Sequence, residues 1–250
     1  MAVSILPEEC SIFGLLGAAT LVLMHIDRGR LIAGVLAAAV GKRSIHIKSN
    51  VVPDHGTSHV TVIDHDGNAV SCTSTINQIF GSMRASQTLG IIWNDEMDDF
   101  STPGASNAFG FAPSPSNFIA PGKRPMSSMS PMVIYNKNEN NIVMVVGASG
   151  GSFIISATAQ TVIRTMLFNQ TVKEAVDAPR LHNQFLPHVT QYEKPVPEEI
   201  VTLLTNVYKQ NMTMVEKQKS VVQALEQHPD GFIHGNSDFR RQTATYPAGY

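Results

Sequence analysis

The chain has 250 residues, of which 43% are hydrophobic and 15% are charged, so an intrinsically disordered chain is excluded and one sizeable core or two small ones can be buried. The formal net charge is −2, and no run of basic residues is interleaved with aromatic residues. Nucleic acid is therefore not an expected partner.

The first fifty residues differ in character from the rest of the chain. Apolar residues fill 12–24 and 31–40, and charged residues separate the two stretches. Neither stretch reaches the roughly 20 residues of a membrane helix, and Glu8 and Glu9 stand where a signal peptide carries positive charge. We predict two short buried helices in a separate segment 1–50, with an imperfect signal peptide or anchor as the alternative.

From residue 51 onward, strand and helix patterns alternate, which predicts an α+β domain over 51–250. Residues 58–63 and 69–76 are β-branched runs around a polar turn, and they predict a hairpin. Residues 132–135 and 142–146 predict a second hairpin on the same grounds.

The segment between the two hairpins is mostly irregular in its pattern. A short strand is expected at 90–93, whereas 94–131 is rich in Ser, Pro, Gly and Asn and has few periodic apolar residues. Loops of this length inside a domain are usually functional or mobile.

The C-terminal part predicts helices followed by strands. Apolar residues recur at helical spacing over 152–168, and Thr171 with Glu174 predicts a capping box. Pro197 begins a third helical pattern that continues to about residue 207. The expected closing strands are 221–225 and 232–234.

The Gly56-Thr57 step before the first strand allows two interpretations. One is an ordinary turn that leads into a strand. In the other, cleavage of this peptide bond gives Thr57 a free α-amine, which can take the proton from its own hydroxyl and make that hydroxyl a nucleophile. The local spacing leaves both open.

The glycine-rich sequence 147–151 between a strand and a helix has three interpretations. It satisfies G-x-S-x-G, which in an α/β-hydrolase makes Ser149 the nucleophile. Downstream acids and histidines in a suitable order are Asp177, Asp230, His228 and His234. Alternatively, its backbone N–H groups stabilise an oxyanion at the helix N-terminus, or the glycines only allow tight packing.

Two further polar groups are candidates for ligand binding. Residues 94–99 include four carboxylates, which either lie in solvent or surround a cationic ligand such as an ammonium group. Ser127 and Ser128 follow Lys123 and Arg124, and their hydroxyls can donate to a ligand carboxylate.

No metal site is expected from the sequence. His55 and His59 have helical spacing but lie in a predicted turn and strand, where they would not point together, so a site with Asp64, His65 and Asp66 is rejected. The two cysteines, Cys10 and Cys72, cannot make a disulfide framework and have no zinc-ligand spacing.

Taken in order, the motifs of 51–250 resemble the small catalytic subunit of the γ-glutamyltransferases, also called glutathione hydrolases. The motifs are DHGTSHV (54–60), AVSCTSTIN (69–77), NDEMDDF (94–100), PSPSNF (113–118), PGK (121–123), SSM (127–129), GASGG (147–151), PRLHNQ (179–184) and PAGY (247–250). The resemblance implies an N-terminal nucleophile hydrolase fold, an αββα sandwich of which this chain supplies the small-subunit portion.

The resemblance also implies residue roles. Thr57 is released by autocleavage after Gly56 and becomes the nucleophile, and Thr75 orients its hydroxyl. Gly150 and Gly151 supply the oxyanion N–H groups, which leaves Ser149 without a catalytic role. The groups implied in donor binding are Asn77, Glu96 and Asp99 for the α-amino group, and Ser127 and Ser128 for the α-carboxylate.

The implied reaction takes a γ-glutamyl group from glutathione or a related conjugate onto Thr57 as an ester, and passes it to water or to an amino-acid or peptide acceptor. It implies no cofactor. Family members carry a large subunit that completes the fold, whereas only 56 residues precede Thr57 here. We therefore expect a large-subunit partner or a homo-oligomer, and the alternative is a catalytically inactive light-chain-like protein.

Family analogy also places the protein on the extracellular face of the plasma membrane or among secreted proteins, although this sequence has no clear signal peptide or transmembrane helix.

Overall fold

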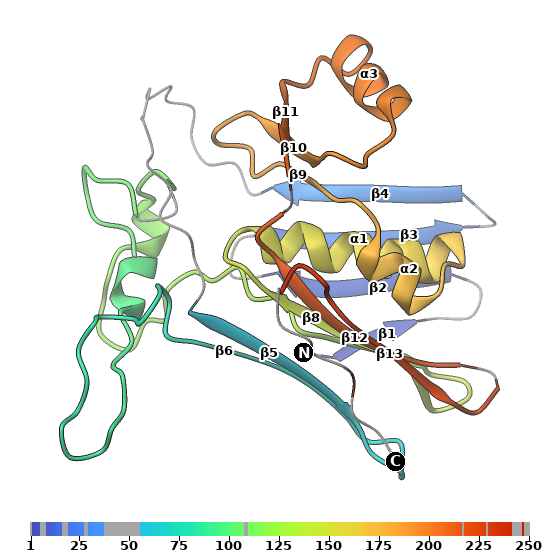
Figure 1. Cartoon of the computed structure of the whole chain (residues 1–250), viewed down its shortest axis with the longest axis horizontal. Helices are drawn as coiled ribbons and strands as arrows, with labels where there is room; N and C mark the ends of the chain where they lie inside the picture. Colours follow the sequence, from blue (N-terminus) through green and yellow to red (C-terminus); the bar gives the residue numbers. More distant parts are fainter. Residues whose placement is uncertain are drawn as a thin grey trace.

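A five-stranded sheet forms the centre of the computed structural model, which describes residues 56–107, 110–216, 218–228, 230–241 and 247, together with the backbone of four earlier strands (Figure 1). Its strand order is β1-β7-β8-β12-β13. These strands are β1 (Ala2–Ile5), β7 (Met132–Asn136), β8 (Asn141–Ser149), β12 (Val221–Gln227) and β13 (Ile233–Ser237). Strand β1 joins β7 in parallel, and the other pairs are antiparallel.

Alternating side chains give the sheet two buried faces. Met144, Val146 and Ala148 of β8 belong to the main hydrophobic core, which they share with helices α1 (Phe153–Phe168) and α2 (Val172–Asp177) on one face. The hairpin of β5 (Thr57–Ile63) and β6 (Ala69–Thr75) covers the other face, where His59 packs against Gly147 (Figure 1).

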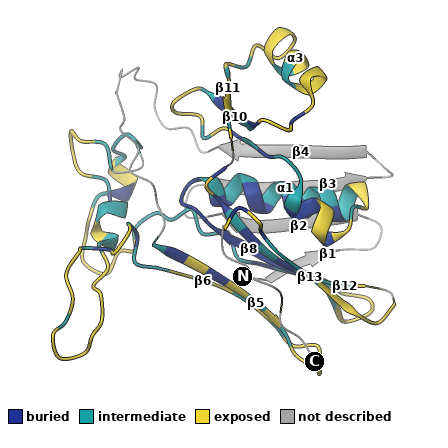
Figure 2. Cartoon of the chain, in the orientation of Figure 1, coloured by how far each residue is buried: buried dark blue, intermediate teal, exposed yellow. Residues whose placement is uncertain are grey.

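These layers confirm the predicted α+β class but reproduce the αββα sandwich only in part. Helices, sheet and hairpin account for three layers. Within the described residues no helix covers the outer face of the β5–β6 hairpin, where Val60, Val62 and Val70 are 52%, 48% and 55% exposed (Figure 2). The predicted hairpins 58–63 with 69–76 and 132–135 with 142–146 are both confirmed.

Local signals also placed the three helices after residue 150 correctly. The Thr171–Glu174 capping box starts α2, and α1 ends at Phe168, after which Asn169 adopts a left-handed conformation at φ 54°. Helix α3 (Glu198–Asn206) follows Pro197 as expected. It lies beside a small sheet in the order β11-β10-β9, made of β9 (Leu181–His182), β10 (Thr190–Glu193) and β11 (Met212–Val215).

The strand expected at 90–93 is wrong. This segment folds back on residues 82–86 through Ser82 N–H to the Trp93 carbonyl (2.9 Å) and Ser86 N–H to the Ile91 carbonyl (2.8 Å), with only an isolated bridge. Ile91, Ile92 and Trp93 are 48%, 38% and 48% exposed, so no buried apolar face stabilises a regular strand. The long irregular segment is confirmed, apart from the 3₁₀ helices η2 (Glu96–Asp99) and η3 (Pro115–Asn117).

The two N-terminal helices are also wrong where the backbone is described. Strands β2 (Glu9–Leu16), β3 (Thr20–Asp27) and β4 (Arg30–Ala37) pair antiparallel in one sheet. Periodicity alone does not separate a buried helix from a strand in a continuous apolar run, which explains the error. The helices that the structure describes are all too short or too polar to cross a bilayer.

Candidate active site

Two threonine hydroxyls meet at the start of the β5–β6 hairpin. Thr57 begins β5 and lies directly opposite Thr75, the last residue of β6. Their Oγ1 atoms are 2.9 Å apart, and Thr75 Oγ1 also accepts the backbone N–H of Asn77 at 2.8 Å. The contact with Thr75 orients the Thr57 hydroxyl. Because Thr57 is only 8% exposed, little water competes for this hydrogen bond.

The peptide group before Thr57 is held by the segment that follows β6. The Gly56 carbonyl accepts the N–H of Ile76 at 3.1 Å. A Cβ at Gly56 would lie 2.4 Å from the carbonyl oxygen of Gln78 and 2.5 Å from that of Asn77. Only glycine fits this approach, so the Gly56–Thr57 bond is fixed beside the Thr57 hydroxyl.

Asn77 connects this pair of threonines to the acidic segment. It is 3% exposed with φ 70°, and its Nδ2 donates to the Asp95 carbonyl at 3.2 Å. The Asp95 carboxylate accepts the N–H of Gln78 at 3.0 Å. Residues far apart in the sequence are thereby brought together next to Thr57.

Glu96 has the unusual environment of a half-buried carboxylate that lacks a partner on one oxygen. Burial raises its pKa, a hydrogen bond with Asp99 lowers it, and the charge of Asp95 raises it further. Its Oε2 atom is fully buried and makes no hydrogen bond to any described residue. Such an oxygen beside other carboxylates is suited to a cationic group.

Asn117 is a site residue that analysis of the sequence missed. It is 7% exposed, and its Nδ2 donates to the Asp99 carbonyl at 2.7 Å while its Oδ1 accepts the N–H of Met126 at 3.0 Å. It therefore ties the acidic segment to the chain just before Ser127 and Ser128. The only signal available was its place in the PSPSNF motif.

The two candidate carboxylate-binding serines are half-buried in this irregular chain. Ser127 Oγ accepts the N–H of Met129 at 3.2 Å, and the Ser128 carbonyl accepts the hydroxyl of Ser130 at 3.1 Å. Because Asn117 holds Met126, both serines are linked through the backbone to the segment that contains Glu96 and Asp99.

The candidate oxyanion glycines form the turn between β8 and α1. Gly150 has φ 122° and Gly151 has φ 59°, conformations that favour glycine. A Cβ at Gly150 would lie 2.6 Å from the Cα of Ser220, so the turn packs directly on the chain leading into β12. Figure 1 shows this turn at the same end of the molecule as the start of β5.

The structure does not assemble a triad around Ser149. Ser149 pairs with Val221 at one end of β12, whereas His228 follows the other end of that strand. At about 3.3 Å per residue, the length of β12 separates them by roughly 20 Å. The other candidate acid, Asp177, is bonded to Lys173 and Asn236.

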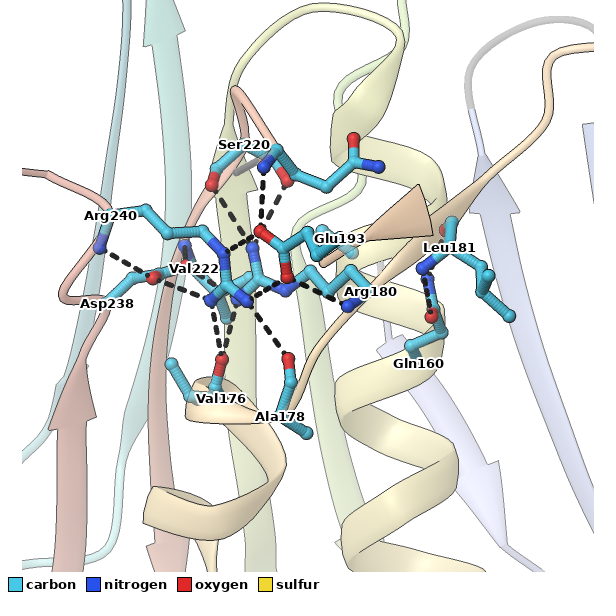
Figure 3. A network of polar contacts seen from close by, with 12 residues as sticks. Gln160, Val176, Ala178, Arg180, Leu181, Glu193, Ser220, Val222, Asp238 and Arg240 are labelled. Carbon is cyan, nitrogen blue, oxygen red and sulfur yellow. Dashed lines mark hydrogen bonds and ion pairs between the residues drawn. The ribbon is translucent and has the colours of Figure 1, made fainter. Parts of the chain in front are cut away.

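A network of buried charges supports the chain on which Gly150 packs (Figure 3). Arg180 contacts Asp238 at 2.5 Å, and Arg240 contacts Asp238 at 3.0 Å and Glu193 at 2.5 and 2.7 Å. All four side chains are 5% exposed or less. Two guanidinium groups and two carboxylates balance in charge, which buried ions require.

This network fixes Ser220 beneath the glycine turn. The Arg180 guanidinium donates to the Ser220 carbonyl at 3.1 Å and to its hydroxyl at 3.2 Å. Burial opposes ionisation of Glu193, but hydrogen bonds from Arg240 and from the N–H groups of Gln218 and Arg180 hold its pKa below the usual value. Of the four charged residues, only Arg180 stands in a motif quoted above, PRLHNQ, and no role was predicted for any of them.

His59 lies on the inner face of β5, two residues after Thr57. Its Nδ1 is 2.8 Å from the Thr73 hydroxyl and its Nε2 is 3.3 Å from the Ser71 hydroxyl. The ring packs on Gly147, and burial lowers its pKa from 6.5 to about 4. Asp64, His65 and Asp66 lie in the exposed turn of this hairpin instead.

We expect His59 to make stability depend on pH. Between pH 6.5 and about 4 the unfolded chain binds a proton that the folded chain excludes, so the free energy of unfolding falls as the pH falls. The size of the His59 pKa shift limits its contribution to the free energy of unfolding to about 3 kcal/mol. Urea unfolding across this range should show a smaller loss for His59→Gln than for the unchanged chain or the exposed His65→Gln control, and equal losses would contradict the assignment.

Comparison with known proteins identifies the family. Residues 35–248 match the family described as Gamma-glutamyltranspeptidase. Glutathione hydrolase proenzyme 1 from Schizosaccharomyces pombe is 42% identical over 76% of this chain and 30% of its own length. Scoloptoxin SSD20 from Scolopendra dehaani is 40% identical over 74% of this chain and 93% of its own length.

The fold agrees with solved structures of the same family. A crystal structure of a mutant Helicobacter pylori gamma-glutamyltranspeptidase has a TM-score of 0.67 and 36% identity, over 73% of this chain and 98% of that chain. The chain spans about a third of the length of most of the curated relatives that it matches first. From the sequence match and the shared fold together, the chain belongs to the gamma-glutamyltranspeptidase family.

Proposed function

We propose that this chain is the catalytic light-chain portion of a γ-glutamyltransferase that also hydrolyses glutathione, with Thr57 as its nucleophile. The observation that carries the proposal is the 2.9 Å contact between the Thr57 and Thr75 hydroxyls, directly after a glycine that tolerates no side chain. Family membership supports the same reaction class.

In the proposed reaction, hydrolysis of the Gly56–Thr57 bond first consumes one water and frees the Thr57 amine. The amine then takes the proton from the Thr57 hydroxyl as Oγ1 attacks the γ-carbonyl carbon of the donor. The N–H groups of Gly150 and Gly151 stabilise the oxyanion. The γ-amide C–N bond of the donor then breaks, and the leaving amine takes that proton. In the second half-reaction, water or an acceptor amine attacks the ester carbonyl carbon, which releases the γ-glutamyl group and restores the Thr57 hydroxyl.

Donor recognition is assigned to the polar groups around the acidic segment. Asn77, Glu96 and Asp99 bind the α-ammonium group, and the buried unpaired Oε2 of Glu96 supports this role. Ser127 and Ser128 donate to the α-carboxylate. The donors are glutathione and other γ-glutamyl compounds, and no cofactor takes part.

Replacement of Asp99 with Asn tests this donor site. A neutral amide no longer attracts the donor ammonium, so we expect KM for a γ-glutamyl anilide to rise about 5- to 100-fold, while kcat changes less. Release of the coloured aniline measures both constants. The matched control is Asp66→Asn in the exposed turn, and a donor KM unchanged by Asp99→Asn would show that the pocket is misplaced.

We also propose that a large subunit, or a second copy of the chain, covers the outer face of the β5–β6 hairpin. Val60, Val62 and Val70 form an exposed β-branched row there, and unpaired apolar faces of this kind favour association. This chain spans only 30% and 31% of the length of two glutathione hydrolase proenzymes, which supports the same view.

A second candidate is a light-chain-like protein that binds partners without catalysis. A relative named as an inactive glutathione hydrolase favours it: Putative inactive glutathione hydrolase 4 from Arabidopsis thaliana is 43% identical over 57% of this chain and 74% of its own length. Two relatives are named scoloptoxins, which also supports a location outside the cell or on the outer surface of the plasma membrane.

The segments 1–50 and 51–250 remain our proposed division of the chain.

A further inference from the structure

A second cluster of ionisable side chains lies at the turn of the β12–β13 hairpin. His228, Asp230 and His234 each offer a ligand atom, and the three atoms lie within 4.8 Å of one another. No other group of this kind occurs among the residues that the structure describes. Figure 1 shows this turn at the opposite end of the molecule from the start of β5, so it is separate from Thr57.

The carboxylate of Asp230 is oriented toward both imidazole rings. Its Oδ1 accepts the N–H of Phe232 at 2.8 Å. Its Oδ2 is 3.2 Å from Nδ1 of His228 and 3.2 Å from Nε2 of His234. One carboxylate oxygen is thus held by the backbone, and the other is shared by two ring nitrogens.

The hairpin backbone fixes the spacing of the three side chains. Glu226 pairs with His234 and Gln227 with Ile233, and the His228 N–H then donates to the Phe232 carbonyl at 2.9 Å. Gly231 closes the turn with φ 88°. The backbone positions of the three residues are therefore fixed before any ion binds, which lowers the entropy cost of binding.

The geometry suits a tetrahedral transition-metal ion. Ligands at roughly 2.0–2.1 Å from a tetrahedral ion are about 3.3 Å apart, close to both N–O distances. The remaining N–N distance of at most 4.8 Å needs only side-chain rotation. Imidazole ligands favour Zn²⁺, Ni²⁺ or Cu²⁺ over Mg²⁺ and Ca²⁺.

We propose that His228, Asp230 and His234 form a surface binding site for a divalent transition-metal ion of the Zn²⁺ class. The side chains are 48%, 41% and 44% exposed, so the fourth position of a tetrahedral ion opens to solvent or to an external ligand.

Calorimetric titration of the full chain with ZnCl₂ tests the proposal. We expect a saturable site with one ion per chain, weakened at least about tenfold in His228→Ala, Asp230→Asn and His234→Ala, since loss of an outer-shell partner alone costs that much. His65→Ala is the matched control, because His65 is also an exposed histidine 3.2 Å from a turn aspartate, Asp66. It should bind zinc like the unchanged chain.

Thermal unfolding gives a second readout of the same site. Zinc should raise the Tm of the unchanged chain and of His65→Ala, but not that of His234→Ala, and each melt also reports whether the variant is folded. Absence of saturable zinc binding, or equal zinc affinity in folded His234→Ala, would overturn the proposal. Neither result depends on the γ-glutamyl reaction, so the two proposals fail separately.

Discussion

Thr57→Ala is expected to keep the Gly56–Thr57 bond intact and to lower γ-glutamyl transfer at least about 10³-fold, the loss typical when a nucleophile is removed. The variant lacks the hydroxyl that contacts Thr75, and without cleavage no free amine can take a proton. Mass spectrometry measures cleavage, and aniline release from a γ-glutamyl anilide measures transfer.

Two further variants control this experiment. Ser149→Ala removes a hydroxyl of similar burial in the same region, and it should be cleaved and active because Ser149 has no triad around it. Thr57→Ser restores a hydroxyl and should recover part of both processes. Transfer by Thr57→Ala at the rate of the unchanged chain, or loss of transfer in Ser149→Ala alone, would contradict the assignment.

Arg180→Met should reduce the free energy of unfolding by about 3–5 kcal/mol, the usual loss when one partner of a buried ion pair is removed. The change leaves Asp238 with one guanidinium partner instead of two and removes both hydrogen bonds to Ser220. Urea unfolding followed by far-UV circular dichroism measures the loss.

Lys173→Met is the matched control, because Lys173 forms a close ion pair with Asp177 but is 73% exposed. Solvent screens such a pair, so its midpoint of unfolding should stay near that of the unchanged chain. If Arg180→Met unfolds at the same urea concentration as Lys173→Met, the network does not stabilise the fold as argued.

Much of the fold could be predicted where the signal is local. The β-branched runs around 64–68 predict the β5–β6 hairpin, and the Thr171–Glu174 pair predicts the start of α2. The candidate active site was harder to predict, because Thr57 and Thr75 are 18 residues apart and each alone is an ordinary strand residue. Only the ordered motifs, through a family resemblance, connected them.

The remaining features depend on contacts that no local pattern reveals. Arg180 and Asp238 are 58 residues apart, so their ion pair exists only after the C-terminal strands pair. Strands β9, β10 and β11 span four residues at most, which is too short for an alternating hydrophobic pattern to be recognised. Asn117 is one more polar residue in a segment rich in them, and its importance comes from its two bonding partners.

Intact mass and N-terminal sequencing of the purified chain test the central claim most directly, because cleavage requires a folded site around Thr57. We predict a product that begins at Thr57 and contains 250 − 56 = 194 residues. A chain that stays uncut, both alone and after mixing with the large subunit of a relative, would contradict it.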